Sequence, residues 1–117
     1  MIEVYGIPNC NTVKKALDWL KEHAVTYRFH DYKKEGISRE KLEVWSHHFG
    51  WENLVNKAGT TWKKLPDDVK ETIVDQRSAV QLMLHQNSVI KRPVIEAGKK
   101  WLLRFNEEEY KAVLLNK

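Results

Sequence analysis

The start of the chain shows a strand-like pattern of apolar positions followed by a helix-like one. Residues 2–5 form a short β-prone run that ends at Gly6 and Pro8. From about residue 11 the apolar positions recur at helical spacing, and residues 26–30 then alternate as a second strand. The pattern therefore predicts a β-α-β unit with two parallel strands and a right-handed crossover. The apolar helix positions are Val13, Ala16, Leu17 and Leu20.

The middle of the chain, from 38 to 86, has helical patterns only, and we interpret it as a helical insertion. Ser38 is a good N-cap for its first helix, and Gly50 is a good stop signal. The apolar face of that helix would carry Leu42, Trp45 and Phe49. Further helical pieces are expected over 51–57, from Pro66 through Ile73, and from Ser78 onward with Ala79, Leu82 and Met83 facing inward.

The pattern from residue 93 onward predicts a hairpin and a closing helix. Residues 93–97 and 100–104 are β-prone runs around Gly98-Lys99, a pair that suits a tight turn. A helix should follow from its cap Asn106, with acidic residues at its positive end and Tyr110, Val113 and Leu114 facing the core. The order β-α-β, helices, β-β-α predicts an α/β fold. Without a repeat or linker, we expect a single domain over 1–117.

Composition and charge narrow the class of protein. The 117 residues are 42% hydrophobic, with five Trp, which is typical of a packed globular domain. The net charge of +4 comes from scattered basic doublets rather than one dense tract, so we expect no direct nucleic-acid binding. No apolar run is long enough to span a membrane, and no signal peptide is expected. A single cysteine fits a reducing compartment, so the expected location is the cytoplasm.

Cys10 is the strongest candidate for chemistry, because it lies between the first strand and the first helix. The unpaired N–H groups of a helix N-terminus favour a thiolate over a thiol and can also hold an oxyanion. The simpler interpretation is a buried, inert cysteine. The polar neighbours Asn9, Asn11 and Thr12 argue against it, and Lys14 adds positive charge within one turn.

The sequence gives little support to other kinds of functional site. Thr12 and Val13 occupy the places where a second cysteine would form a redox pair, so any resolving thiol must come from outside. His47 and His48 are adjacent and point to different helix faces, so no metal site is expected. No glycine-rich nucleotide motif occurs.

Three segments resemble the glutaredoxin-linked arsenate reductase (ArsC) family, which also contains the Spx-type regulators of RNA polymerase. The segments are 5–16 around Cys10, 87–95 with an Arg-Pro pair, and 102–105 with a second arginine. Together they cover the order of elements along nearly the whole chain. Residues 59–65 resemble an uncharacterised subgroup of ArsC-like small reductases more than the arsenate reductases proper.

The resemblance implies a thioredoxin-like fold, a nucleophilic Cys10, and Arg92 and Arg104 as the groups that bind an oxyanion or a glutathione carboxylate. It also implies that Pro93 is cis and shapes the site. Asn11 and Thr12 would complete the anion-binding set at the helix start. Without the resemblance, either arginine could equally be a solvent-facing strand residue. No bound cofactor is expected; glutathione is the implied co-substrate, and glutaredoxin a possible protein partner.

The chain departs from the family in its middle segment, where Asn56 stands in place of an expected arginine. Lys57 would point about 100° away on a helix and would not replace it. This loss argues against arsenate. The leading hypothesis is a glutathione-linked reductase that uses Cys10 on a small oxidised substrate, either a mixed disulfide or an oxyanion such as arsenate. The alternative is an Spx-like, non-enzymatic protein that binds RNA polymerase, although the redox-sensing members of that branch have a CxxC pair.

Overall fold

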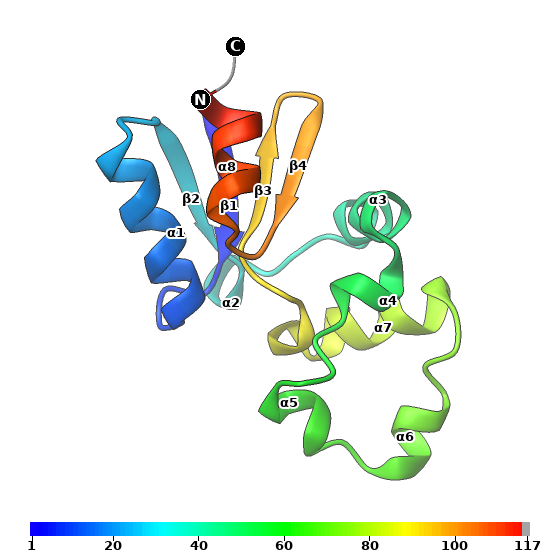
Figure 1. The fold of residues 1–117 in the computed structure, drawn as a ribbon. Coiled ribbons are helices and arrows are strands. Elements are labelled where there is room, and N and C mark those ends of the chain that lie inside the picture. Colours follow the sequence, from blue (N-terminus) through cyan, green and yellow to red (C-terminus); the bar gives the residue numbers. More distant parts are fainter. Residues whose placement is uncertain (116–117) are drawn as a thin grey trace. The chain divides into compact units, whose positions relative to one another are not determined.

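The computed structural model describes residues 1–115, which form two compact units (Figure 1). The first, here called the sheet unit, consists of 1–35 and 92–115. The second, the helical unit, consists of 36–91 and includes the predicted insertion. That the chain forms one domain stays a prediction, and each unit is described by itself.

The sheet unit contains a mixed four-stranded sheet in the order β2-β1-β3-β4. β1 pairs with β2 in parallel and with β3 antiparallel, and β3 pairs with β4 antiparallel. This β-α-β and β-β-α arrangement is the thioredoxin-like fold that the resemblance implied. Its elements are β1 (Ile2–Gly6), α1 (Asn11–Glu22), β2 (Tyr27–Asp31), α2 (Tyr32–Glu35), β3 (Val94–Ala97), β4 (Lys100–Leu103), α8 (Glu107–Tyr110) and a π-helical turn (Lys111–Leu115).

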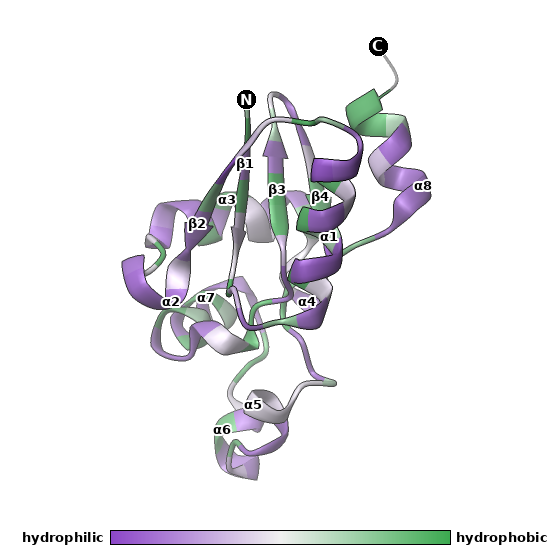
Figure 2. Cartoon of the chain, turned by 90° about the vertical axis from the view of Figure 1, so that its left-hand side faces the viewer, coloured by the Kyte–Doolittle hydropathy of each residue, from purple (hydrophilic) through white to green (hydrophobic). Residues whose placement is uncertain are grey.

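The core of the sheet unit lies between the sheet and the helices α1 and α8. Strand β3 is mainly hydrophobic, whereas much of α1 and the first turn of α8 are hydrophilic (Figure 2). The polar faces of the two helices therefore face solvent, and their apolar faces pack on the sheet. The buried residues of this core are Val4, Ala16, Trp19, Leu20, Ile95, Leu102 and Tyr110.

Most local predictions for the sheet unit are confirmed. The hairpin turns at Gly98, whose φ of 66° lies in the left-handed region that glycine adopts freely. The carboxamide oxygen of Asn106 accepts a hydrogen bond from the Glu109 N–H at 3.0 Å, as expected of the cap of α8. Helix α1 buries Val13 as predicted, and Leu17 is only partly buried. Helix α2 was not predicted.

The helical unit contains α3 (Arg39–Phe49), α4 (Trp51–Leu54), α5 (Thr60–Lys63), α6 (Asp67–Glu71), α7 (Gln76–His85) and a 3₁₀ turn (Asn87–Val89). Ser38 caps α3 as predicted, since its hydroxyl oxygen accepts from the Lys41 N–H at 3.2 Å. Gly50 ends that helix with a φ of 86°. Among the residues described, no helix has the length and apolarity needed to cross a membrane.

Three predicted helix boundaries in this unit are wrong, and α5 was not predicted. The helix expected from Pro66 through Ile73 ends at Glu71. The expected helix over 51–57 ends at Leu54, because Val55 is extended and forms a β-bridge with Ile90. The helix expected to open at Ser78 begins at Gln76 instead, with Asp75 as its N-cap. Ser78 is the N3 residue of the helix and forms a capping box with Asp75: its N–H donates to the Asp75 carboxylate at 2.9 Å. The inward positions predicted for α7, Ala79, Leu82 and Met83, are buried.

Candidate active site

Four segments of the sheet unit leave the sheet at one edge. Gly6, the last residue of β1, pairs with Asp31, the last residue of β2. In the antiparallel direction Val94, the first residue of β3, pairs with Tyr5 of β1 and with Leu103 of β4. The ends of β1, β2 and β4 and the start of β3 are therefore neighbours. This topology brings together the loop to Cys10, the start of α2, the Arg92-Pro93 pair and Arg104.

Cys10 is the N-cap residue of α1. Its backbone is extended, with φ −140° and ψ 125°, and its side chain is partly exposed. The chain reaches this position from Gly6, which is buried against the first turn of α1: a Cβ on Gly6 would meet Cγ2 of Val13 at 3.0 Å. The absence of a side chain at Gly6 thus lets the end of β1 lie close to the helix that carries the thiol.

The surroundings of Cys10 favour its thiolate. Burial raises the pKa of the Cys10 thiol, but the Val13 N–H, the Arg92 guanidinium and the Thr12 N–H together outweigh it, so that the pKa is lowered from the ordinary value of 9.0. The two N–H groups belong to the first turn of α1 and have no partner within the helix. The remaining favourable contribution comes from a full positive charge on Arg92.

Arg92 is the arginine that acts directly on the thiol. Its positive charge lowers the pKa of the Cys10 thiol and opposes the burial that raises the pKa of Tyr32, so Arg92 lies near both groups. It precedes Pro93, which is buried, and the Arg92–Pro93 peptide bond is cis. The cis bond was implied by the family resemblance and is confirmed. Cys10 and Arg92, which are distant in the sequence, therefore form one site.

Tyr32 is a member of this site that the sequence analysis missed. It is the first residue of α2, and its side chain is only 1% exposed. Burial raises the pKa of Tyr32 to about 12, against the opposing effect of the Arg92 guanidinium, so the phenol is neutral at physiological pH. The available sequence signal was a tyrosine placed directly after the second strand, at the edge where a β-α-β unit carries its functional loops.

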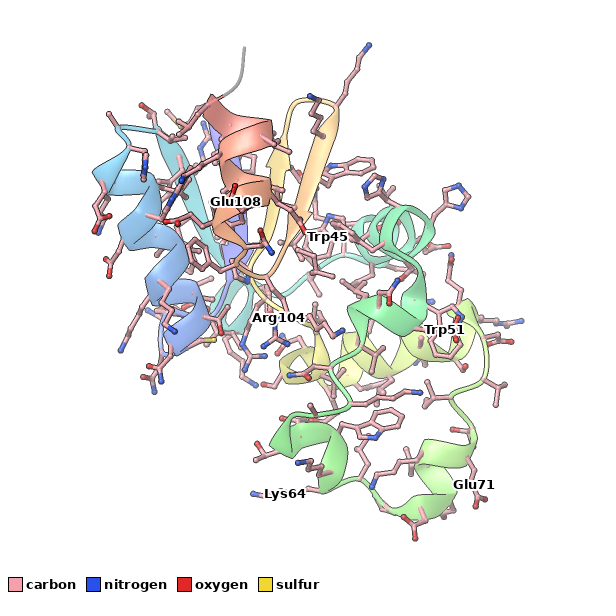
Figure 3. All side chains as sticks on the ribbon, viewed as in Figure 1. Trp45, Trp51, Lys64, Glu71, Arg104 and Glu108 are labelled. Carbon is pink, nitrogen blue, oxygen red and sulfur yellow. The ribbon has the colours of Figure 1, made fainter. Side chains whose placement is uncertain are left out.

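Arg104 is placed differently from Arg92. It is exposed, follows β4, and has a φ of 64° in the left-handed region. Its N–H donates to the Pro93 carbonyl at 2.8 Å, and its carbonyl accepts from the Tyr110 hydroxyl. Its side chain lies at the end of β4 in Figure 3. Arg104 is not among the groups that most affect the pKa of Cys10. The structure therefore places Arg104 at the same edge of the sheet as Cys10 and Arg92, and Arg104 is an exposed cation there.

The remaining predicted positions are more peripheral. Asn11 is the exposed first residue of α1, and Thr12 contributes through its backbone N–H. Asn56 belongs to the helical unit, where its side-chain oxygen accepts from the Ala58 N–H at 3.2 Å. Since the segment after Leu54 is not helical, the prediction that Lys57 points 100° away from Asn56 on a helix is wrong.

Lys57 has its own aromatic surroundings within the helical unit. Its ammonium group lies 5.9 Å from the ring centre of Trp51 and 5.3 Å from that of Trp62. These cation–π contacts hold Lys57 locally. Over residues 1–115, no group of three or more His, Cys, Asp or Glu side chains is arranged to hold a metal ion.

Comparisons with known proteins show the family of this chain. The family model described as ArsC family matches residues 5–113. The solved structure of the YFFB protein superimposes with a TM-score of 0.93 at 47% identity, covering 97% of this chain and 99% of that one. The solution structure of an arsenate reductase (ArsC) related protein from Brucella melitensis gives a TM-score of 0.76 at 46% identity, covering 99% and 95%. A curated relative, the global transcriptional regulator Spx from Streptococcus mutans, is 29% identical over 97% of this chain and 83% of its own length.

Proposed function

The chain belongs to the ArsC family, and from this premise we propose that it is a cytoplasmic, glutathione-dependent thiol oxidoreductase with Cys10 as its nucleophile. The thiol-oxidoreductase part is supported by the family and by the arsenate reductase-related structure that it resembles. Glutathione as the co-substrate and the cytoplasm as the location are our proposal. They agree with a chain that has a single cysteine and so depends on an external thiol.

The observation that carries the proposal is the place of Cys10 at the start of α1, where the first-turn N–H groups and the charge of Arg92 lower the pKa of its thiol. A thiolate, rather than a thiol, is the nucleophile in thiol–disulfide exchange. The guanidinium and the helix N–H groups stabilise the thiolate before substrate arrives. They also remain as donors for an anionic substrate that approaches the sulfur.

The proposed substrate is a mixed disulfide of glutathione with a small or protein thiol. The Cys10 thiolate attacks the glutathione sulfur, a new Cys10–glutathione disulfide forms, and the substrate thiolate leaves and takes up a proton. A second glutathione thiolate then attacks the glutathione sulfur of that disulfide. Cys10 leaves as the thiolate and oxidised glutathione is released. The net reaction consumes one reduced glutathione for each substrate thiol released, and that glutathione leaves in a disulfide with the one that the substrate delivered. A glutaredoxin thiol could take the place of the attacking glutathione.

The proposed anion-binding groups surround this reaction. Arg104 is exposed at the same sheet edge and has the fork of N–H donors that suits a glutathione carboxylate. Asn11 and Thr12 would contribute polar groups beside it at the start of α1. An oxyanion such as arsenate is the less favoured substrate, because Asn56 carries no charge where the family has an arginine.

The test is steady-state turnover of the mixed disulfide of glutathione and 2-mercaptoethanol, with reduced glutathione present. Wild-type protein should turn over this substrate, and Cys10→Ser should not. Arg92→Lys should lose much of the activity, because it retains the charge but not the forked donors. Arg28→Ala is the matched control: it also removes a positive charge from the sheet unit, at a side chain that is 64% exposed and 3.8 Å from the Glu3 carboxylate. Full activity in Cys10→Ser, or equal losses in Arg92→Lys and Arg28→Ala, would refute the proposal.

A second candidate is a non-enzymatic regulator that binds RNA polymerase. It is favoured by the 29% identity to Spx, which extends over nearly the whole of this chain. Val13 occupies the place of the second cysteine of a redox-sensing CxxC pair, so we rank this function below the enzyme. Purified RNA polymerase passed over immobilised chain would distinguish the two. Saturable binding that persists in Cys10→Ser, together with absent turnover, would favour the regulator.

A further inference from the structure

Two hollows of the helical unit follow one another along α7. The first, with a volume of about 530 Å³, opens beside the start of α7 and is lined by two arginines, Arg39 and Arg77. The second, with a volume of about 500 Å³, extends to the end of the helix at His85. The two hollows share three lining residues, so they are adjacent and form one groove, here called the α7 groove. The shared residues are Thr72, Ser78 and Gln81.

The end of the α7 groove near His85 is mainly apolar. One of its walls is α6, a helix that buries none of its own residues. The apolar lining consists of Leu65, Pro66, Val69, Ile73 and Leu82. Leu82 is buried, whereas the other four keep exposed surface. This end therefore offers apolar surface to a ligand, as small-molecule sites do.

The end of the α7 groove near the start of the helix is cationic. Arg39 is the first residue of α3, Arg77 is the second residue of α7, and both side chains are exposed. The Arg39 guanidinium donates to the Gln81 side-chain oxygen at 2.7 Å, which holds Arg39 at the junction of the two hollows. Since a guanidinium has five N–H donors, this bond leaves others for a ligand.

One carboxylate lines the same hollow as the two arginines, and it is already hydrogen-bonded. Asp75 accepts from the Ser78 N–H at 2.9 Å and from the Ser78 hydroxyl at 2.8 Å, as the cap of α7. Two positive charges and one negative charge leave this hollow with a net charge of +1. An anionic group therefore complements it.

We propose that the α7 groove binds a small amphipathic carboxylate, whose carboxylate group pairs with Arg39 and Arg77 and whose apolar body lies along α6. The forked N–H donors of arginine match the geometry of a carboxylate. The stretch of α7 from Arg77 to His85 is about 12 Å long, at about 1.5 Å per residue, which suits a medium-length acyl chain. The lining residues all belong to the helical unit, whereas Cys10 belongs to the sheet unit, so this site goes beyond the proposed function.

The experiment measures the binding of octanoate to the full chain by isothermal titration calorimetry, and backbone amide NMR shifts locate the site. Octanoate should bind saturably and shift the amide signals of Thr72, Ser78 and Gln81. 1-Octanol, which has the same chain length without the charge, should bind roughly tenfold more weakly, because it lacks the charge-assisted hydrogen bonds. Absent saturable binding at millimolar octanoate, equal affinity for 1-octanol, or shifts confined to the sheet unit would each overturn the proposal.

Arg77→Gln tests the cationic end of the groove. It should weaken the binding of octanoate roughly tenfold and leave that of 1-octanol unchanged. Lys63→Gln is the matched control, because it removes one positive charge from an exposed side chain of α5 that lies outside the lining of the groove. This control should bind octanoate as wild type does. Equal weakening in the two variants would show a general effect of charge and overturn the pairing with arginine.

Val69→Gln tests the apolar end of the groove. It places a polar side chain that helices tolerate on the wall formed by α6, so it should weaken octanoate and 1-octanol alike, by several-fold. Wild-type affinity for both would show that the acyl chain does not lie along α6. Circular dichroism of each variant verifies the fold. If Val69→Gln does not fold, Ile73→Thr changes the same lining and answers the same question.

The failure of this inference differs from the failure of the proposed function. Cys10→Ser retains every residue of the α7 groove and should bind octanoate as wild type does, although it should not turn over a mixed disulfide. Loss of octanoate binding in Cys10→Ser would place the ligand at the candidate active site and overturn the α7 groove as its site. Turnover by Cys10→Ser would refute the proposed function and leave the groove unaffected.

Discussion

The N–H of Arg104 donates to the carbonyl of Pro93 at 2.8 Å, so the second arginine lies opposite the residue that follows the first. This backbone contact continues the pairing of β3 with β4 by one position beyond Val94 and Leu103. Arg92 lies before β3 and Arg104 lies after β4, so the two cations lie at the same edge of the sheet. Arg92 lowers the pKa of the thiol, and Arg104 is exposed.

Removing Arg92 and removing Arg104 should affect Cys10 differently. Arg92→Ala should raise the pKa of the Cys10 thiol, because it removes a positive charge that stabilises the thiolate. Arg104→Ala should leave that pKa near wild type but raise the KM for a glutathione mixed disulfide several-fold. Alkylation profiles and steady-state kinetics on both variants check this. Equal pKa shifts would show that the division of roles is wrong.

Folding stability should depend on pH through Cys10. Its pKa is lower in the folded chain than the ordinary 9.0. The thiolate therefore contributes stability that is fully present above the unfolded pKa and is lost as pH falls through the folded pKa. Urea unfolding of wild type and Cys10→Ser at several pH values should show the wild-type advantage growing with pH and levelling off above about pH 9. The effect should be small, because the thiol is partly exposed. A constant difference would contradict a lowered pKa.

The end of α1 can be made more stable. Ala24 has a φ of 54°, and its N–H donates to the Lys21 carbonyl at 3.1 Å while the Val25 N–H donates to Leu20 at 2.9 Å. This pair of bonds is a Schellman motif, whose left-handed position normally holds glycine. Ala24→Gly should stabilise the chain by about 1 kcal/mol in urea unfolding. Ala58→Gly, at an exposed alanine with negative φ, should give no such gain.

The contact between Gly6 and α1 should tolerate little added volume. A Cβ at position 6 would meet Cγ2 of Val13 at 3.0 Å, and Val13 is fully buried and β-branched, so it cannot easily move. Gly6→Ala should cost about 1 to 3 kcal/mol of stability. The double variant with Val13→Ala should lose less than the sum of the two single changes. If the two losses of stability simply add, the contact with Val13 is not what disfavours a side chain at position 6.

The helical unit offers a test of the capping box at the start of α7. The Ser78 N–H and hydroxyl hold the pKa of the Asp75 carboxyl below its usual value, so the cap contributes stability above the ordinary carboxyl pKa and loses it as pH falls through the folded value. Asp75→Ala should lower the melting temperature by a few degrees at neutral pH, and by less in acid. Asp75→Asn, which retains the acceptor oxygen, should recover most of the loss at neutral pH. An equal loss at every pH would contradict the ionised cap.

The sequence by itself determined the elements whose signals are local. The strand over 2–6, the helix from 11, the hairpin at Gly98 and the caps Ser38 and Asn106 all depend on neighbouring residues, and these are as expected. The identity of the candidate nucleophile was local as well, because a cysteine before a helix has the same N–H groups beside it in any fold.

Only the tertiary structure decided which distant groups surround that cysteine. Val55 is extended rather than helical because the backbone around it hydrogen-bonds in the β-bridge to Ile90. Ile90 lies far along the chain, so the local sequence could not predict it as a partner. Tyr32 looked like an ordinary aromatic residue at a strand end. The order of the strands places it and Arg92 beside Cys10, and a pKa responds to charges through space rather than along the chain.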